Sequence, residues 1–269
     1  MEKISNNAFK SAKSHKSTKL PFIKMHGLGN DYVYIDCFAA DTAALIAHAD
    51  LPALARRVSD RHYGIGSDGL VLILPSDHAD AKMRIFNADG SEAQMCGNAS
   101  RCIAKYAFEH GMCGQHMTLE TPAGIKPISI QTHDGRVTQV TVAMGTTMGN
   151  PHKVFFVDSE AELAPFFEHL CTDPQYADLR ATTNIECACV LNKDTLRMRV
   201  CERGSGETMA CGTGACATAT EAMNRGLTAH EVTVRMCGGD VQVRRDEDGM
   251  IYMTGPANEV FHGIYTWEE

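Results

Sequence analysis

A short block of sequence occurs twice in this chain of 269 residues, and this repeat limits the folds that the chain can adopt. One copy spans Gly90–Asn98 and the other spans Gly204–Thr213. Each copy has a Gly-Ser turn, a spacer, and then a Cys-Gly pair that opens a segment typical of a helix. The spacers differ by one residue. The blocks therefore indicate two related halves, each with a cysteine at the start of a helix.

Short strands dominate the rest of the pattern. We expect helices at residues 50–62, 102–110, 161–170 and 215–224. We expect strands at residues 22–25, 32–38, 69–74, 82–86, 126–131, 136–143, 153–157, 186–190, 195–201, 232–236, 241–244 and 250–254. Asp50 and Pro52 suit the start of the first helix, and Asp134-Gly135 suits a hairpin turn. Because the strands outnumber the helices and do not alternate with them, the sequence favours an α+β fold over a doubly wound parallel sheet.

The first 20 residues differ from the rest of the chain. They contain five lysines, four serines and few large apolar side chains. This composition predicts a disordered extension over residues 1–20. A transit peptide is the weaker interpretation, because such peptides favour Arg over Lys.

Composition excludes several classes of protein. The formal charge of −8 argues against a nucleic-acid binder with a broad basic face. No apolar run approaches the roughly 18 residues that a membrane-spanning helix needs. The 11 cysteines are odd in number and follow no secretory signal, which disfavours a secreted disulfide framework. We therefore expect a cytoplasmic protein with free thiols and with neither a nucleic-acid nor a membrane partner.

The two Cys-Gly pairs are suited to proton transfer at carbon. Cys96 and Cys211 are expected at helix starts, where free backbone N–H groups and the helix dipole stabilise a thiolate. Gly97 and Gly212 permit close backbone approach. Two such thiols on opposite sides of a cleft would invert a carbon centre, one removing a proton and the other delivering one to the opposite face. The backbone N–H groups would bind a substrate carboxylate.

Other interpretations of these residues are weaker. The nine remaining cysteines are expected to be packing residues. No Cys-x-x-Cys occurs, and His26, His62 and His152 are scattered, so we expect no metal site. The glycines of residues 64–69 lack the dinucleotide-binding spacing and precede a strand instead of a helix.

Four separated blocks resemble the diaminopimelate epimerase family, whose members need neither pyridoxal phosphate nor a metal. The blocks are Lys24–Asp31, Phe86–Asn98, Met148–His152 and Glu202–Ala215, and the resemblance covers nearly everything after Pro21. It implies two similar half-domains, each with strands wrapped around a central helix and with the active site in the cleft between them. We place the N-terminal half at residues 21–122, joined by a returning segment at 257–269, and the C-terminal half at residues 123–256. The resemblance also implies a homodimer, no cofactor, and the interconversion of LL- and meso-2,6-diaminopimelate for lysine and peptidoglycan synthesis.

The resemblance carries over to individual positions. Cys96 and Cys211 match the acid–base pair, with Cys211 accepting the proton of the LL substrate and Cys96 donating one. His152 matches a histidine that shapes the site beside Glu202. The positions that match substrate-binding residues are Asn30, Asn87, Gly97, Asn98, Asn150, Asn184, Glu202, Arg203, Gly212 and Thr213. Arg203 suits a bidentate contact with the distal carboxylate of an amino acid substrate, and the asparagines suit ammonium and carboxylate groups together.

Three departures from the family pattern leave the substrate open. Gly69 stands where some members carry Gln, residues 99–101 read Ala-Ser-Arg where Gly-Ala-Arg is usual, and the connection from Gly145 to Asn150 is short. They motivate a second hypothesis, a related racemase acting on histidine, lysine or an analogue of diaminopimelate. A third hypothesis is a thiol redox protein in which Cys96 and Cys211 form a disulfide.

Overall fold

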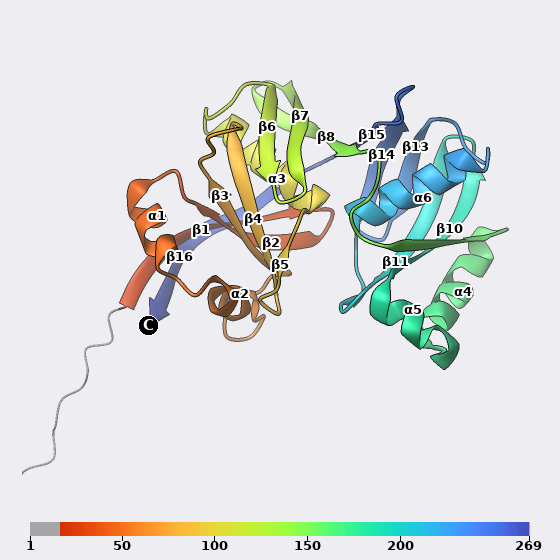
Figure 1. Cartoon of the computed structure of the whole chain (residues 1–269), viewed down its shortest axis with the longest axis horizontal. Coiled ribbons are helices and arrows are strands. Elements are labelled where there is room, and N and C mark those ends of the chain that lie inside the picture. Colours follow the sequence, from red (N-terminus) through yellow and green to blue (C-terminus); the bar gives the residue numbers. More distant parts are fainter. Residues whose placement is uncertain (1–16, 269) are drawn as a thin grey trace, which may run out of the picture.

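The computed structural model describes residues 17–268, and its strands join into one continuous sheet that divides into two halves (Figure 1). The strands are β1 (Ser17–Gly27), β2 (Asn30–Asp36), β3 (Gly69–Leu74), β4 (Ala81–Asn87), β5 (Glu92–Ala93), β6 (His116–Thr121), β7 (Gly124–His133), β8 (Arg136–Gly145), β9 (His152–Val157), β10 (Asn184–Asn192), β11 (Thr195–Glu202), β12 (Gly206–Glu207), β13 (Glu231–Met236), β14 (Gly239–Arg245), β15 (Ile251–Gly255) and β16 (Asn258–Glu268). The helices are α1 (Ala40–Ala47), α2 (Leu51–Ser59), α3 (Gly97–Glu109), α4 (Glu160–Thr172), the 3-10 turn η1 (Pro174–Tyr176), α5 (Ala177–Thr182) and α6 (Gly212–Asn224). The sheet order is β16-β1-β2-β3-β4-β6-β7-β8-β15-β14-β13-β11-β10-β9.

In the first half, strands surround the buried helix α3 (Figure 1). Its side chains are mostly small, and Ala99, Cys102 and Ala104 are fully covered, so strands approach the helix closely. Helices α1 and α2 lie on the opposite face of the same strands. This explains why all of β3 is apolar: alternate side chains pack on α2 and on α3, so both faces of the strand are buried.

The second half repeats this arrangement around α6. Ala215, Ala219 and Ala222 lie on its buried face and allow close contact with the strands. Helix α4 covers the outer face, where Phe167 packs with Ile185 of β10. The prediction of two repeated half-domains, each with strands around a helix, is confirmed.

Two strand pairings tie the halves together. β8 pairs with β15, from Val140 opposite Gly255 to Gly145 opposite Ile251. β16, which follows every other element, returns to the first half and pairs with β1 along its length. Both β7 and β8 pack against α3. We therefore propose a boundary between the halves near residue 146 in place of the expected one after residue 122.

Most predicted elements are present, with shifted ends. Asp50 caps α2 by accepting a hydrogen bond from the Ala53 N–H at 3.1 Å, although the helix ends at Ser59 and not at residue 62. The hairpin turn has φ of 50° at Asp134 and 75° at Gly135, the left-handed pair that such a turn requires.

The predicted disordered extension includes residues that the structure places in a strand. Residues 17–20 belong to β1, where Leu20 is fully buried, so the prediction of disorder is wrong for them. Residues 1–16 lie outside the described part of the chain. The sequence pattern also missed α1, η1, α5, β5, β6, β12 and β16 as elements.

Candidate active site at the junction of the halves

Each half presents a thiol at the start of its central helix. Cys96 is the N-cap of α3 and Cys211 is the N-cap of α6, both in extended backbone conformation. The Gly214 N–H in the first turn of α6 donates to Cys211 Sγ at 3.3 Å. Such a bond favours the thiolate form of the cysteine.

The two helix starts lie against the same methionine. A Cβ on Gly97 would lie 2.5 Å from Met253 Cε, and one on Gly212 would lie 3.1 Å from the same atom. Asn98 reaches across the junction, where its Nδ2 donates to the backbone oxygen of Ala210 at 3.2 Å. The fold therefore brings both Cys-Gly pairs, together with Asn98, to one place between the halves.

The Cys96 thiol lies beside an amide oxygen. It donates to Asn30 Oδ1 at 3.6 Å. Burial raises the pKa of the Cys96 thiol, and backbone N–H groups of the first turn of α3 oppose the rise. Asn30 is held by a two-residue hairpin in which Leu28 and Gly29 have φ of 58° and 82°. This left-handed turn sets the position of Asn30 at the start of β2.

The Cys211 thiol instead lies beside a carboxyl group. Burial, followed by the charge of Glu202, raises the pKa of Cys211 well above its ordinary value. The Thr213 hydroxyl lies 3.4 Å from Cys211 Sγ. Glu202 accepts a hydrogen bond from the Thr208 hydroxyl, and burial raises the pKa of Glu202, while the nearby Cys211 thiol opposes the rise. Cys211 therefore has a neighbour that can accept its proton, whereas the amide beside Cys96 cannot.

Other predicted residues of the second half gather at the ends of β9, β10 and β11. Asn184 Oδ1 accepts from the Arg203 backbone N–H at 2.9 Å, and Asn184 is opposite His152 in the β10–β9 ladder. His152 Nδ1 lies 2.7 Å from Glu186 Oε1, and both side chains are buried. The Arg203 residue is exposed, and within residues 17–268 its guanidinium makes no salt bridge. It is therefore available to an anion.

Two predicted asparagines are placed further out. Asn87 ends β4 and donates to the Ser91 hydroxyl at 2.9 Å, inside the first repeated block. Asn150 is exposed in the connection between β8 and β9. Over the described range, no hydrogen bond joins either side chain to Cys96 or Cys211.

Three charged residues that the sequence reasoning missed support the site. Asp68 Oδ2 accepts from Asn30 Nδ2 at 2.9 Å, and the fully buried Arg101 donates to Asn98 Oδ1 at 2.8 Å. Glu186 is also fully buried, and its Oε2 has no hydrogen-bond partner. Arg101 and Glu186 each interrupt a segment of small or apolar residues, which was the available signal. A charge inside a buried element needs a partner.

The remaining cysteines are free thiols, like the two at the junction. Cys37, Cys102, Cys187, Cys189, Cys201 and Cys216 are buried as predicted. Cys237 is exposed in the turn between β13 and β14, so its prediction as a packing residue is wrong. In the described part of the chain, no three His, Cys, Asp or Glu side chains are grouped to hold a metal. No helix among those residues is long and apolar enough to cross a bilayer.

Solved structures share the two-half fold and define its structural class. A phenazine biosynthesis protein of the PhzF family from Bacillus anthracis superposes with a TM-score of 0.69 at 17% identity, covering 92% of this chain and 99% of its own. A hydroxyproline epimerase from Agrobacterium vitis gives a TM-score of 0.67 at 14% identity, covering 95% and 93%. The class is thus a duplicated fold with a central helix in each half.

Sequence similarity identifies the family within this class. The family model of diaminopimelate epimerase matches residues 22–148 and again residues 146–260. The diaminopimelate epimerase of Bacteroides thetaiotaomicron is 46% identical over 92% of this chain and 98% of its own. That of Acetivibrio thermocellus is 41% identical over 90% and 97%. The chain belongs to the diaminopimelate epimerase family. The two matched stretches meet at residues 146–148, next to the boundary that the packing suggests.

Proposed function

We propose that this chain interconverts LL- and meso-2,6-diaminopimelate by moving protons between two thiols and one α-carbon. The observation that carries the proposal is the meeting of both Cys-Gly helix starts at a single junction, with Met253 against both glycines. The substrate is supported by relatives named diaminopimelate epimerase at 41% and 46% identity. By the family resemblance, the product serves lysine and peptidoglycan synthesis.

The different neighbours of the thiols give each a role with the LL substrate. Cys211 passes its proton to the Glu202 carboxylate, and the resulting thiolate removes the α-proton. Cys96, whose amide neighbour cannot accept a proton, delivers its own to the opposite face. The cycle closes when the proton on Glu202 returns to the Cys96 thiolate through solvent. The same steps run backwards from the meso form.

Binding of the substrate uses both helix starts and the second half. Free N–H groups at Gly97-Asn98 and Gly212-Thr213 hold the reacting carboxylate and stabilise the charge that develops on it. The exposed Arg203 binds the distal carboxylate, with Asn184 fixing its backbone. Asn30, Asn87 and Asn150 complete the recognition of the ammonium and carboxylate groups. His152, which is hydrogen-bonded to Glu186, helps to shape the site beside Glu202.

Replacing one thiol at a time tests the two-base mechanism. We expect Cys96→Ala to form no meso product from the LL substrate, because no acid remains on one face. Cys211→Ala should also lose inversion. Hydrogen–deuterium exchange at the α-carbon and the stereochemistry of the product are measured together, with Cys216→Ala as the control for losing a buried thiol. Full inversion by either single variant would overturn the mechanism.

A second candidate substrate class is favoured by Gly69. A Cβ at this position would lie 2.0 Å from the Phe86 backbone oxygen and 2.8 Å from Tyr32 Cε1. The glutamine that some family members carry here does not fit without moving β4. One substrate contact is therefore absent or replaced, which motivates a racemase for histidine, lysine or an analogue of diaminopimelate. A panel assayed by α-proton exchange decides, since exchange with these but none with diaminopimelate rejects the leading substrate.

We infer a cytoplasmic location from the same two thiols. Two cysteines that serve one reacting carbon must be kept from forming a disulfide, which a reducing compartment achieves. Activity that requires a reductant supports the enzyme. Activity of some other kind, appearing only on oxidation, would favour the redox protein instead.

A homodimer is our proposal for the assembly. β16 is the edge strand of the sheet that residues 17–268 form, and it exposes the apolar side chains Val260, Phe261 and Ile264. A second copy of the chain would cover it. Light scattering coupled to gel filtration measures the mass in solution, and Ile264→Asp should shift a dimer towards monomer. A monomeric parent protein would reject the proposal.

A further inference from the structure

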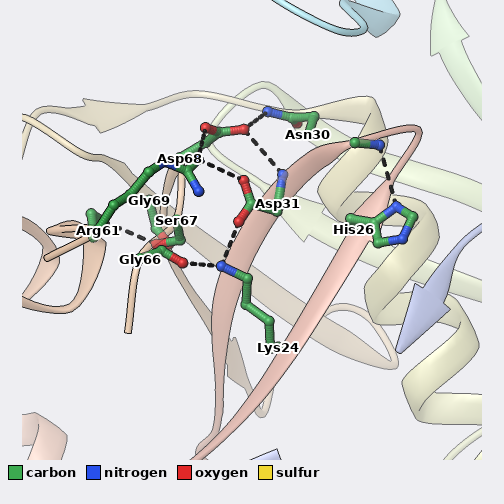
Figure 2. A network of polar contacts seen from close by, with 11 residues as sticks. Lys24, His26, Asn30, Asp31, Arg61, Gly66, Ser67, Asp68 and Gly69 are labelled. Atoms are coloured by element: carbon green, nitrogen blue, oxygen red, sulfur yellow. Dashed lines mark hydrogen bonds and ion pairs between the residues drawn. The ribbon is translucent and has the colours of Figure 1, made fainter. Parts of the chain in front are cut away.

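A chain of polar contacts leads from a surface arginine towards the Cys96 thiol, and Figure 2 shows its first part. Arg61 Nη2 lies 2.9 Å from Asp31 Oδ1 and 2.9 Å from Asp68 Oδ1. Asp68 Oδ2 accepts from Asn30 Nδ2 at 2.9 Å and from the Asp31 backbone N–H at 3.0 Å. Asn30 Oδ1 then lies 3.6 Å from Cys96 Sγ. A single side chain therefore separates the Asp68 carboxylate from the thiol.

Asp68 decides which end of the Asn30 amide faces the thiol. A carboxylate only accepts hydrogen bonds, so Nδ2 points to Asp68 and Oδ1 points to Cys96. On the other side, the Arg101 guanidinium only donates, and it holds Asn98 Oδ1. Asn98 therefore donates its Nδ2 to Asn30 Oδ1, at 3.1 Å. An anion at one end and a cation at the other give the pair of amides one orientation.

The carboxylate cluster is itself anchored. Lys24 bonds to Asp31 and to the Gly66 backbone oxygen (Figure 2). Burial, and then the charge of Asp31, raises the pKa of Asp68, while Arg61 opposes the rise. Arg61 thus bridges the two carboxylates, and Lys24 pairs with Asp31 alone. These residues lie on strands β1 and β2 and on the segment between α2 and β3.

We propose that Asp68 is a positioning residue for the reaction: by holding the Asn30 carbonyl on Cys96, it keeps that thiol protonated and aimed to deliver its proton. A hydrogen bond to the neutral form of an acid disfavours ionisation. Without Asp68, only the hydrogen bond from Asn98 Nδ2 still orients the Asn30 amide. The flipped state, in which an Asn30 N–H faces the sulfur and stabilises the thiolate, then becomes more populated. The inference rests on the proposed function only in making Cys96 the proton donor.

Other groups act on the same thiol and stay in place when Asp68 is changed. They are Glu202, Arg101, Tyr32, Tyr34 and Cys102. Their influence is common to all variants. Asp68→Ala and Asp68→Asn both remove the Asp68 charge, so the difference between these two variants reports the Asn30 amide.

The test measures the ionisation of both thiols in the same molecule. Iodoacetamide labelling of Cys96 and Cys211 is followed by peptide mass spectrometry across a pH series, in the parent protein, Asp68→Ala and Asp68→Asn. We expect Asp68→Ala to lower the apparent pKa of Cys96 by about half a unit, roughly threefold more thiolate at a given pH, and to leave that of Cys211 unchanged. Asp68→Asn keeps an oxygen for Asn30 and should restore the parent value. Asp80→Ala is the matched control, because Asp80 accepts two hydrogen bonds from Thr118 outside the network.

The turnover rate is the second quantity to be measured. Asp68→Ala should lower kcat for the LL substrate by at least about tenfold, with Asp68→Asn close to the parent. An unchanged Cys96 pKa in folded Asp68→Ala overturns the inference, and equal shifts at both thiols assign Asp68 a merely structural role. If Asp68→Ala does not fold, Asp68→Ser, whose hydroxyl is too short to reach Asn30, takes its place. Labelling needs no substrate. A Cys96 pKa that shifts as expected in a protein without epimerase activity therefore rejects the proposed function and leaves the positioning intact.

Discussion

At the scale of single residues, the two halves differ most around their thiols. Cys96 and Cys211 occupy equivalent helix starts but have different neighbours. Cys96 donates to an amide oxygen at 3.6 Å, whereas burial and the charge of nearby Glu202 raise the pKa of Cys211. Duplication accounts for the matching helices. The proposed reaction begins with one thiolate and one thiol. This difference between the thiols comes from their neighbouring side chains, which lie outside the repeated blocks.

This difference predicts a bell-shaped dependence of activity on pH. Burial raises the pKa of both thiols, so little thiolate is present at neutral pH and exchange should accelerate as the pH rises towards those raised values. At higher pH the second thiol also loses its proton, the acid disappears and the rate falls. Initial rates of α-proton exchange from pH 6 to 10 measure it. A rate that falls steadily as the pH rises from 6 would contradict the assignment.

Gly69 is a second residue-scale test. A Cβ would meet the Phe86 backbone oxygen at 2.0 Å, so Gly69→Ala should destabilise the protein by about 1–3 kcal/mol, the usual penalty of overpacking. Gly114→Ala, where a Cβ meets nothing within 4 Å, is the control and should be neutral. Urea denaturation followed by circular dichroism compares the two. An alanine tolerated at position 69 would restore the case for a glutamine-like contact there.

At the scale of elements, the sequence predicts best what local chemistry fixes. Asp50, Asp134-Gly135 and the Cys-Gly pairs mark helix starts and a turn by backbone geometry alone, and the structure has them there. Helix α1 has no side-chain cap at Ala39 and was missed. The local pattern also missed strand β16, because its partner β1 lies at the far end of the chain. Only the family resemblance, with its returning segment at 257–269, indicated that this segment joins the first half.

The site shows the same limit. Both cysteines, Glu202 and Arg203 stand in recognisable motifs, whereas Asp68 and Arg101 act through contacts that only the folded chain creates. Asn30 was expected to bind substrate, and its link to Asp68 was not visible. A residue that acts only by orienting another side chain belongs to no sequence motif, so the sequence alone does not reveal its role.

The cap of α2 gives an element-scale prediction. Asp50→Ala removes the hydrogen bond to the Ala53 N–H and should lower the free energy of unfolding by about 1 kcal/mol. Asp50→Asn keeps an acceptor and should lose far less. Thermal unfolding compares both with the parent. Equal losses in the two variants would show that the charge, and not the cap, stabilises the helix.

For the whole molecule, the continuous sheet predicts that the halves unfold together. The β8–β15 ladder crosses the junction, and Asn98 bonds to Ala210 across it. Pulse labelling with iodoacetamide, read by peptide mass spectrometry, reports the first half through the buried Cys102 and the second half through the buried Cys216. We expect coincident urea transitions from the two probes. Separated midpoints would show that the halves are independent folding units.

The return of β16 to β1 also bears on how the protein is made. On the ribosome, the first half emerges long before the strand that completes the edge of its sheet, and Leu20 and Phe22 of β1 lack part of their cover until β16 arrives. The Cys96 half thus reaches its final form only after the Cys211 half has been synthesised. Each thiol therefore reaches its final surroundings only when the other half is also present. A chain that ends before β16 leaves β1 as an unpaired edge strand, which chaperones and proteases can recognise.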